Sequence, residues 1–410
     1  MKILIVSQYF WPEGFRINAL VKSLVERGIE VDVLTGKPNY PEGNIYKGYK
    51  AWGIKLESWH GANIYRVPLF PRGNKNVIYL ALNYLSFMLS GCFFGPWLLR
   101  NKKYDIVFAY SLSPILLAIP GILMSRIKRT PFILWLQDLW PESLSATGNI
   151  KNSFVLKIVS WVVAWIYRRS DLILIQSHAF KKAVERITPD RKLEYYPNSV
   201  DPSFALPPDP QIKLPSVKAF DSGFSVVFAG NVGVAQSVET LLAAANILRD
   251  YDQIHLVIFG KGSRWEWLKN EVGRCQLNNV HLLGQFPEET MPGLLQQAGA
   301  LLVTLTDQPI FALTVPNKIQ AYMAAGRPIL ACLNGEGARL VEDANAGLVI
   351  AAEDGSGLAH AVLRLYQMPA NERDVLGVNG RNYFYQHFDH EILVDSLIST
   401  MKQVQKAKVN

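Results

Sequence analysis

The stretch from residue 225 to residue 262 reads SVVFAGNVGVAQSVETLLAAANILRDYDQIHLVIFGKG. It begins with an apolar run that ends in a glycine turn, continues with a helix-like pattern over 237–249, and closes with a second apolar run that also ends in glycines. Buried strands that alternate with helices are typical of a parallel sheet with helical crossovers. This stretch therefore predicts one β–α–β unit of a Rossmann-like domain.

The same alternation extends along the chain in both directions. Further strand-like runs lie at 3–10, 31–35, 63–69, 105–111, 131–138 and 171–177, and at 280–285, 300–305, 328–333 and 347–351. A Pro-rich polar stretch from Asp201 to Pro215 separates the two series and predicts a domain boundary. We therefore predict an α/β protein with two Rossmann-like, doubly wound parallel-sheet domains, at 1–200 and 201–380, followed by closing helices.

The composition is that of a folded intracellular protein. The 410 residues are 49% apolar and 19% charged, which suffices for two cores. Cys92, Cys275 and Cys332 are too few and too far apart for a disulfide framework or a metal site. The N-terminus, MKILIVSQYF, lacks the longer apolar core and cleavage site of a signal peptide. We therefore predict a cytoplasmic location.

The first half of the chain is basic and contains one long apolar segment. Residues 1–200 hold 26 Lys and Arg against 13 Asp and Glu, whereas residues 201–410 hold 16 against 21. This imbalance predicts an anionic partner: a membrane surface, a phosphate-bearing substrate or nucleic acid, although no nucleic-acid motif is present. Residues 77–99 run without a charge between Arg72 and Arg100. Because a span would divide one sheet between two sides of a bilayer, we expect a helix in the membrane interface; a buried core helix and a true span are the alternatives.

Two glycine turns in the second half suit a diphosphate. Ligands of open α/β sheets bind where strands end and helices begin, because unpaired amides point there. The turns FAGNVG (228–233) and FGKGSR (259–264) lie at such positions. Arg264 could grip two oxygens at once, so we expect it to be catalytic. The expected binding residues are Gly230, Asn231, Gly233, Gly260, Lys261 and Gly262.

The segment ALTVPNKIQAYMAAGRP (312–328) carries the most weight. Pro316 suits the first turn of a helix, where its missing amide would be unpaired anyway. The amides around Thr314, Val315 and Asn317 are then expected to be free for an anion. Lys318 lies one turn into the helix and could reach the same anion, so we predict that it is catalytic. An ordinary helix with a solvated lysine is the alternative.

Two loops of the first half could receive an acceptor. In SQYFWPEGFRINAL (7–20), Gly14 permits a tight turn before a helix start; a plain turn is the alternative. In WLQDLWPES (135–143), carboxylates beside tryptophan rings suit a sugar, and we predict that Asp138 is catalytic; helix capping by Asp138 is the alternative. The expected acceptor-binding residues are Gly14, Phe15, Arg16, Asn18, Trp140 and Glu142.

No metal site is predicted. The seven histidines include no HExxH pattern, and the sequence has no DxD pair, Walker sequence or nucleophile elbow. We expect no metal and no cofactor, with the charge of a diphosphate met by lysine, arginine and backbone amides.

Five segments resemble the family-4 glycosyltransferases of bacterial O-antigen and capsule synthesis. They are SQYFWPEGFRIN, TGKPNYPEGNIYKGY, WLQDLWPESLSATG, YYPNSVD and VPNKIQAYMAAGRPI, and the third is the most specific. The chain is most similar to the group of N-acetyl-fucosamine or related deoxy-amino-sugar transferases. The resemblance implies the GT-B fold, in which two domains face each other across a cleft. It also implies an acceptor in the first domain, a nucleotide sugar in the second, and a closing helix at 381–410 that returns to the first.

The resemblance also implies a reaction. A sugar would pass from a nucleotide-diphosphate co-substrate to a glycan acceptor, with retention of configuration and without metal, and the leaving diphosphate would help to take the acceptor proton. The acceptor would be linked to a polyprenyl diphosphate, and the enzyme would lie on the inner face of the bacterial plasma membrane.

The chain departs from the family pattern at four positions. The two glutamates that most members carry seven residues apart are Ala312 and Gln320, of which only Gln320 can bond a ribose hydroxyl through its side chain. The family's arginine and lysine after the first glycine turn are replaced by Asn231 and Gln236. A nucleotide-sugar epimerase and a non-catalytic membrane scaffold therefore remain alternatives, and Ala312 favours the scaffold. A nicotinamide dehydrogenase is disfavoured, because no GxGxxG follows the first strand.

Overall fold

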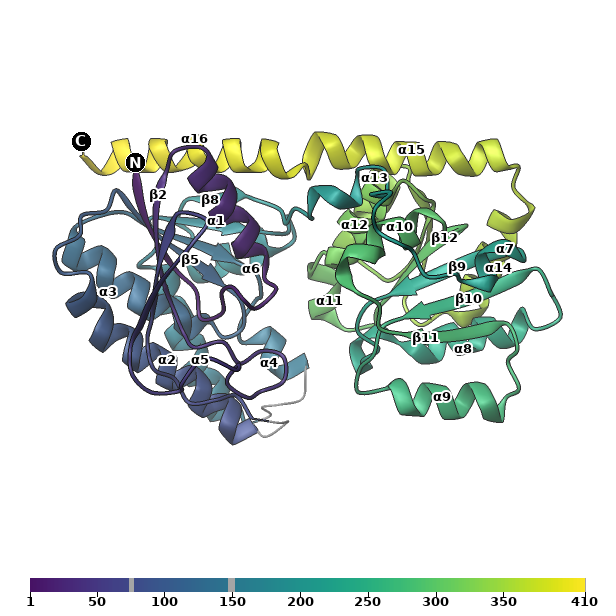
Figure 1. Cartoon of the computed structure of the whole chain (residues 1–410), viewed down its shortest axis with the longest axis horizontal. Helices are drawn as coiled ribbons and strands as arrows, with labels where there is room; N and C mark the ends of the chain where they lie inside the picture. The colour runs from purple at the N-terminus through teal and green to yellow at the C-terminus, as the bar shows by residue number, and fades with distance from the viewer. Residues whose placement is uncertain (74–76, 147–151, 410) are drawn as a thin grey trace. The chain divides into compact units, whose positions relative to one another are not determined.

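The computed structural model describes residues 1–73, 77–146 and 152–409. The chain forms two compact units, Met1–Pro197 with Glu391–Asn410, and Asn198–His390. Each unit contains one sheet with helices packed on it (Figure 1). The predicted pair of parallel-sheet α/β domains is confirmed.

The sheet of the first unit has the strand order β3-β4-β2-β1-β5-β6-β7-β8. Its strands are β1 (Lys2–Val6), β2 (Glu30–Thr35), β3 (Lys55–Trp59), β4 (Ala62–Arg66), β5 (Ile106–Ser111), β6 (Phe132–Leu136), β7 (Leu172–Ile175) and β8 (Leu193–Tyr195). Neighbouring strands are parallel except β3 and β4, which form an antiparallel hairpin at one edge. β3 lacks an apolar run, because its residues are half-buried or exposed, and so it escapes a prediction from hydrophobicity.

Helices cover this sheet and include the end of the chain. They are α1 (Arg16–Glu26), α2 (Val77–Leu98), α3 (Ala118–Lys128), α4 (Glu142–Ala146), α5 (Ser153–Tyr167), α6 (Phe180–Ile187) and α16 (His390–Val409), with a short 3-10 turn at Ile115–Leu117. The apolar side of α16 contributes Val394, Leu397 and Met401 to the same core as Ile3 and Ile5 of β1. The last helix is therefore part of the first unit.

This return begins later than the predicted residue 381. The preceding helix is α15 (Ala370–His387). Phe384 of this helix and Phe388, which follows its end, both lie in the core of the second unit. Because both rings are buried there, the segment up to His390 belongs to the second unit.

The apolar segment at 77–99 forms α2, which packs on one side against α3 and β2. A Cβ on Gly91 would meet Pro120, and one on Gly95 would meet Leu34, so these glycines let α2 approach closely. The opposite side is open, and its exposed residues are Ile78, Tyr79, Leu82, Leu85, Leu89, Phe93 and Trp97. The alternative of a wholly buried core helix is therefore wrong. Ile78–Leu98 is also long and apolar enough to cross a membrane.

The sheet of the second unit is entirely parallel and has the order β11-β10-β9-β12-β13-β14. Its strands are β9 (Phe224–Ala229), β10 (Ile254–Phe259), β11 (Val280–Gly284), β12 (Ala300–Thr304), β13 (Ile329–Cys332) and β14 (Gly347–Ile350). Its helices are α7 (Lys218–Asp221), α8 (Val238–Ile247), α9 (Trp265–Arg274), α10 (Met291–Gln296), α11 (Pro309–Leu313), α12 (Asn317–Ala325), α13 (Glu336–Asp343), α14 (Gly355–Gln367) and α15. Short 3-10 turns lie at Pro202–Phe204, Val234–Gln236 and Glu288–Thr290. The quoted stretch 225–262 forms β9, α8 and β10, as expected.

Candidate active site

The turns after β9 and β10 lie against each other at the carboxyl edge of the second sheet. Gly230 and Gly260 have φ angles of 131° and 129°, a region that favours glycine. A Cβ on Gly260 would lie 1.8 Å from the carbonyl oxygen of Gly230, and one on Gly262 would lie 2.2 Å from that of Val232. The amides of Lys261 and Gly262 have no hydrogen-bond partner among the described residues. The two turns can therefore touch and offer amide donors of the kind that binds phosphate.

The first turn is closed by an uncharged side chain. The Gln236 side-chain oxygen accepts a hydrogen bond from the Gly233 amide at 3.1 Å and from the Asn231 side chain at 3.4 Å. Asn231 and Gln236, which replace two cations of the family pattern, thus bond to each other. The charge of a bound phosphate has to be met from another element.

Lys318 of α12 brings an amino group next to the first turn. Its Nζ lies 3.5 Å from the centre of the Phe228 ring, and a Cβ on Gly230 would lie 2.8 Å from its Cε. This Nζ is buried and has no hydrogen-bond partner in the described structure. Burial lowers the pKa of Lys318 to about 7. An ammonium group held without a partner beside a glycine turn is ready to pair with an anion there.

The two other predicted cations of this unit are placed differently. Arg264 forms an ion pair with Glu239 on α8, and its guanidinium carbon lies 3.9 Å from the centre of the Trp267 ring. It therefore holds α8 and α9 together rather than pointing freely from the turn. Lys261 is exposed, so it can reach a ligand only from solvent.

The segment before α12 has fewer free amides than its sequence predicts. The Thr314 amide donates to the Phe311 carbonyl at 3.2 Å, because the short helix α11 ends there. Pro316 is the N-cap residue and not the first helical residue, which is Asn317. The Asn317 side-chain oxygen accepts from the Asn198 amide group at 3.0 Å. Of the predicted backbone amides, those of buried Val315 and of Asn317 remain without a partner among the described residues.

Gln320 is fully buried inside this region. In the amide orientation that satisfies both of its polar atoms, its nitrogen donates to the carbonyls of Pro316 and Asn317 at 3.1 and 3.2 Å. These bonds use the nitrogen of the side chain, and because Gln320 is fully buried, its oxygen is not exposed to a ribose hydroxyl. Ala312 lies at a crowded position, since a Cβ on Gly335 would be 2.0 Å from its carbonyl oxygen.

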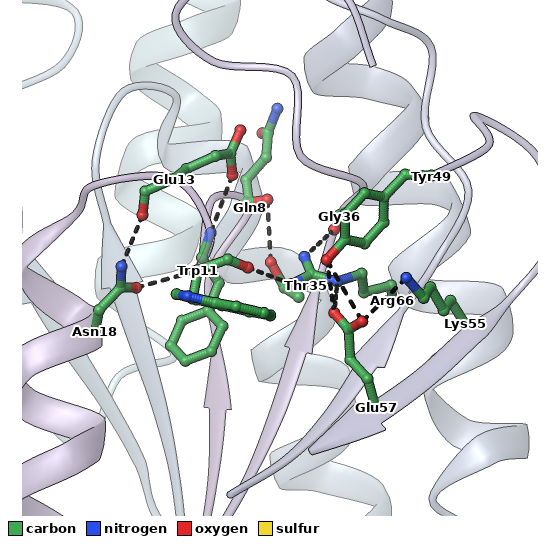
Figure 2. A network of polar contacts seen from close by, with 11 residues as sticks. Gln8, Trp11, Glu13, Asn18, Thr35, Gly36, Tyr49, Lys55, Glu57 and Arg66 are labelled. Atoms are coloured by element: carbon green, nitrogen blue, oxygen red, sulfur yellow. Dashed lines mark hydrogen bonds and ion pairs between the residues drawn. The ribbon is translucent and has the colours of Figure 1, made fainter. Parts of the chain in front are cut away.

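In the first unit, a buried carboxyl group joins the loops after β1 and β2. Glu13 accepts hydrogen bonds from the amides of Phe10, Asn39 and Tyr40 at 3.2, 2.7 and 2.8 Å. Burial raises its pKa to about 7, although the three bonds oppose that shift. The predicted ligand residue Asn18 accepts from the Trp11 amide at 3.0 Å and donates to the Glu13 carbonyl at 2.7 Å (Figure 2). Its side chain thus shapes the loop and is not free for an acceptor.

Arg66 at the end of β4 fixes the same two loops from the other side. Its guanidinium, fully buried, donates to the carbonyl of Gly36 at 3.0 Å, to that of Trp11 and to the Glu57 carboxylate, while the Tyr49 ring lies 5.1 Å away (Figure 2). Arg66 is not among the residues predicted from the sequence. An arginine within the apolar run 63–69 is the only signal, because its partners come from distant parts of the chain.

The start of α1 contains the other predicted ligand residues of the first loop. Gly14 does not require glycine: its φ is not positive, and a Cβ there would meet no atom within 4 Å. This backbone favours the alternative of a plain turn between strand and helix. Phe15 stacks on Tyr9 at 5.2 Å. The Nη1 of Arg16, the first residue of α1, is buried without a hydrogen-bond partner in the described structure, and burial lowers the pKa of its guanidinium.

The loop after β6 and the start of α4 contain the other predicted residues of the first unit. Burial raises the pKa of Asp138, for which the described structure shows no hydrogen-bond partner. The charges of Asp138 and Arg16 act on the pKa of Tyr110 in opposite directions, and burial raises that pKa. Trp140 is buried and donates to the Ser113 hydroxyl at 2.9 Å, which indicates a structural role. Glu142 is exposed at the first position of α4.

Lys318 in the second unit and Arg16 in the first are thus charged groups that their surroundings match poorly. No cluster of three or more His, Cys, Asp or Glu residues suited to a metal is found in 1–73, 77–146 and 152–409.

Two family models match the chain. Residues 14–199 match a glycosyl transferase 4-like domain, and residues 223–368 match the glycosyl transferases of group 1. WcaI of Escherichia coli (strain K12), whose name proposes a colanic acid biosynthesis glycosyl transferase, is 25% identical over 80% of this chain and 82% of its own. WbjE of Pseudomonas aeruginosa, named as a glycosyltransferase, is 24% identical over 81% of this chain and 83% of its own.

Solved structures share the fold at low sequence identity. Sucrose-phosphate synthase from Thermosynechococcus elongatus has a TM-score of 0.74 at 17% identity and covers 99% of both chains. HepE from Anabaena, in complex with UDP and glucose, has a TM-score of 0.68 at 16% identity and covers 98% of this chain and 99% of its own. These similarities confirm the predicted GT-B fold.

Proposed function

We propose that this chain, a glycosyltransferase with the GT-B fold, transfers a sugar from a nucleotide-diphosphate donor to a glycan acceptor in surface polysaccharide synthesis. The observation that carries the proposal is the buried, unpartnered Nζ of Lys318 beside the first glycine turn of the second unit. The name of WcaI and the UDP bound to HepE support the polysaccharide and the nucleotide.

The second unit is proposed to hold the donor. Its diphosphate would accept hydrogen bonds from the amides of the two glycine turns, and Lys318 would neutralise the charge that grows on the leaving group. Because Arg264 is paired with Glu239, it could assist only after exchanging that partner. We propose a metal-independent reaction on this basis, with no cofactor beyond the nucleotide sugar.

The first unit is proposed to hold the acceptor. Asp138 is half-buried and has no hydrogen-bond partner in the described structure, so its carboxyl group could accept a hydrogen bond from an acceptor hydroxyl. The attack is proposed to occur from the face that the diphosphate leaves, with the leaving oxygen taking the proton, which retains the configuration. A deoxy or N-acetylated amino sugar is proposed as the group transferred, from the resemblance of WLQDLWPESLSATG.

The open side of α2 is proposed to lie on the inner face of the plasma membrane. Exposed apolar side chains of α5, namely Phe154, Val155, Ile158 and Trp161, add to those of α2. The charge-free run of α2 lies between Arg72 and Arg100, which suit anionic lipid headgroups. A polyprenyl-diphosphate-linked acceptor would be presented at this surface.

A panel of nucleotide sugars tests the function. A donor that binds the folded protein raises its melting temperature, and the same donor should release nucleoside diphosphate when membranes with lipid-linked glycans are added. The anomeric configuration of the product, read by NMR, tests retention. Binding without any transfer would support the non-catalytic scaffold that Ala312 favours, and the absence of binding would refute the proposal.

A further inference from the structure

A cluster of aromatic rings surrounds one arginine where α2 begins. We refer to Tyr9, Phe15, Tyr40, Arg72 and Tyr84 as the Arg72 cluster. The centres of the Phe15 and Tyr40 rings are 5.1 Å apart, and the Arg72 guanidinium carbon lies 5.1 Å from the centre of the Tyr40 ring. Tyr40 is 37% exposed, so a ligand can reach this ring from solvent.

The charge of Arg72 has no counter-charge in the described structure. No carboxylate among the described residues lies within ion-pair distance of it. Burial raises the pKa of Tyr84, and the charges of Arg72 and Asp138 act on that tyrosine in opposite directions. The carboxyl group of Glu13, whose charge acts on the pKa of Tyr9, already accepts hydrogen bonds from three backbone amides. The cluster therefore has an unmatched positive charge beside open aromatic surface.

Hydrogen bonds fix this cluster to the start of α2. The Arg72 amide donates to the Asn39 side chain at 3.1 Å, and the Asn83 side chain donates to the same oxygen at 3.2 Å and to the Phe70 carbonyl at 2.6 Å. Asn83 is fully buried on the packed side of α2, while its sequence neighbour Leu82 is exposed on the open side. A lipid whose chain follows the open side of α2 would thus have its headgroup near Arg72.

We infer that the Arg72 cluster binds the phosphate-bearing headgroup of a lipid-linked acceptor. A guanidinium can bond two phosphate oxygens at once, and the rings of Phe15 and Tyr40 offer apolar faces to the first sugar. The inference rests on the proposed function, since it names the acceptor group that the first unit recognises. A donor diphosphate has the same chemistry, and the test must separate these two sources.

Direct binding to the full-length protein tests the inference with three probes. The first is farnesyl-diphosphate N-acetylglucosamine, the second is farnesyl N-acetylglucosaminide without phosphate, and the third is UDP. Wild-type protein should bind the first about 10-fold or more tightly than the second, as expected for a charge-assisted phosphate contact. Arg72→Gln should remove that preference, Arg72→Lys should keep part of it, and neither should change the affinity for UDP.

Arg186→Gln is the matched control, because Arg186 is an exposed arginine on α6 of the same unit and lies outside the proposed membrane surface. It should keep the preference of the wild-type protein for the first probe. The inference is overturned if wild-type protein shows no preference for the diphosphate, or if Arg72→Gln retains it. Equal loss of UDP affinity in Arg72→Gln would assign the contact to the donor instead. If the wild-type protein binds UDP but shows no preference for the lipid diphosphate, this inference is wrong, while the proposed transfer is not contradicted.

Discussion

Replacing Lys318 with methionine should have opposite effects on stability and on activity. Methionine keeps most of the length of the side chain and fills the space beside the Phe228 ring. The pKa of Lys318 falls from 10.5 to about 7 on burial. Each pKa unit corresponds to about 1.4 kcal/mol, so burial disfavours the charged form by roughly 5 kcal/mol as an upper estimate.

The sign of the pH effect follows from proton binding. Between pH 7 and pH 10.5 the unfolded chain keeps the Lys318 proton and the folded protein has lost it, so the free energy of unfolding rises with pH in this window. Lys318→Met abolishes this contribution. The ligand-free variant should therefore be more stable than wild type at pH 7, by an amount that shrinks as the pH approaches 10.5.

Activity should change in the other direction. If Lys318 neutralises the leaving diphosphate, its loss should lower the transfer rate about 100-fold or more, which is about 2.7 kcal/mol of transition-state stabilisation. UDP binding should also weaken as the pH rises above 7, because the bound anion requires the protonated lysine. Urea unfolding from pH 6 to pH 10, calorimetry with UDP and single-turnover rates measure the three quantities.

Lys269 on α9 provides the control, since it is an exposed lysine of the same unit. Lys269→Met should leave stability, UDP affinity and rate nearly unchanged. The reasoning about Lys318 is refuted if Lys318→Met transfers sugar at the wild-type rate, or if it is less stable than wild type at pH 7 with no dependence of the difference on pH.

Three further predictions test other parts of the structure. Gly260→Ala should destabilise the second unit by about 2 kcal/mol or more in urea unfolding, because its Cβ would overlap the neighbouring turn. Gly273→Ala on α9 is the control and should stabilise the unit by about 1 kcal/mol, because a Cβ there meets nothing within 4 Å. Equal effects of the two substitutions would contradict the close approach of the turns. Arg66→Met should lower the free energy of unfolding by about 3 kcal/mol or more in the same assay, since Glu57 would lose its buried partner. A neutral result would show that other contacts hold the loops. The double substitution Leu89→Ser with Phe93→Ser should abolish flotation of the protein with vesicles that contain anionic lipid. Its melting temperature should stay within about 2 °C of the wild-type value, because both side chains are exposed. Unchanged flotation would rule out α2 as the membrane-binding face.

The features that the sequence predicts well are those determined by neighbouring residues. The strands and the two glycine turns follow from short apolar runs that end in glycine, and Gly230 and Gly260 indeed have the backbone angles that glycine permits. Lys318 is also predicted as the cation at this site. Its burial is not, because that depends on Phe228, which lies 90 positions earlier in the chain.

The sequence predicts the roles of polar side chains less well than it predicts the strands. Asn18 and Gln320 both resemble ligand-binding residues, yet their amide groups bond to nearby backbone atoms. Such local bonds compete with any ligand, and a sequence pattern does not show which partner wins. Arg66 shows the reverse case, because it bonds to Trp11, 55 positions away, and no short motif predicts that contact.

The return of α16 to the first unit bears on how the protein is made. Val394, Leu397 and Met401 of α16 fill part of the core that also contains β1. β1 is among the first segments to leave the ribosome, and it can complete its packing only after α16, one of the last segments, has been synthesised. The second unit has its residues contiguous in sequence and can fold in the meantime. Until translation reaches α16, the nascent first unit exposes apolar surface that chaperones would bind.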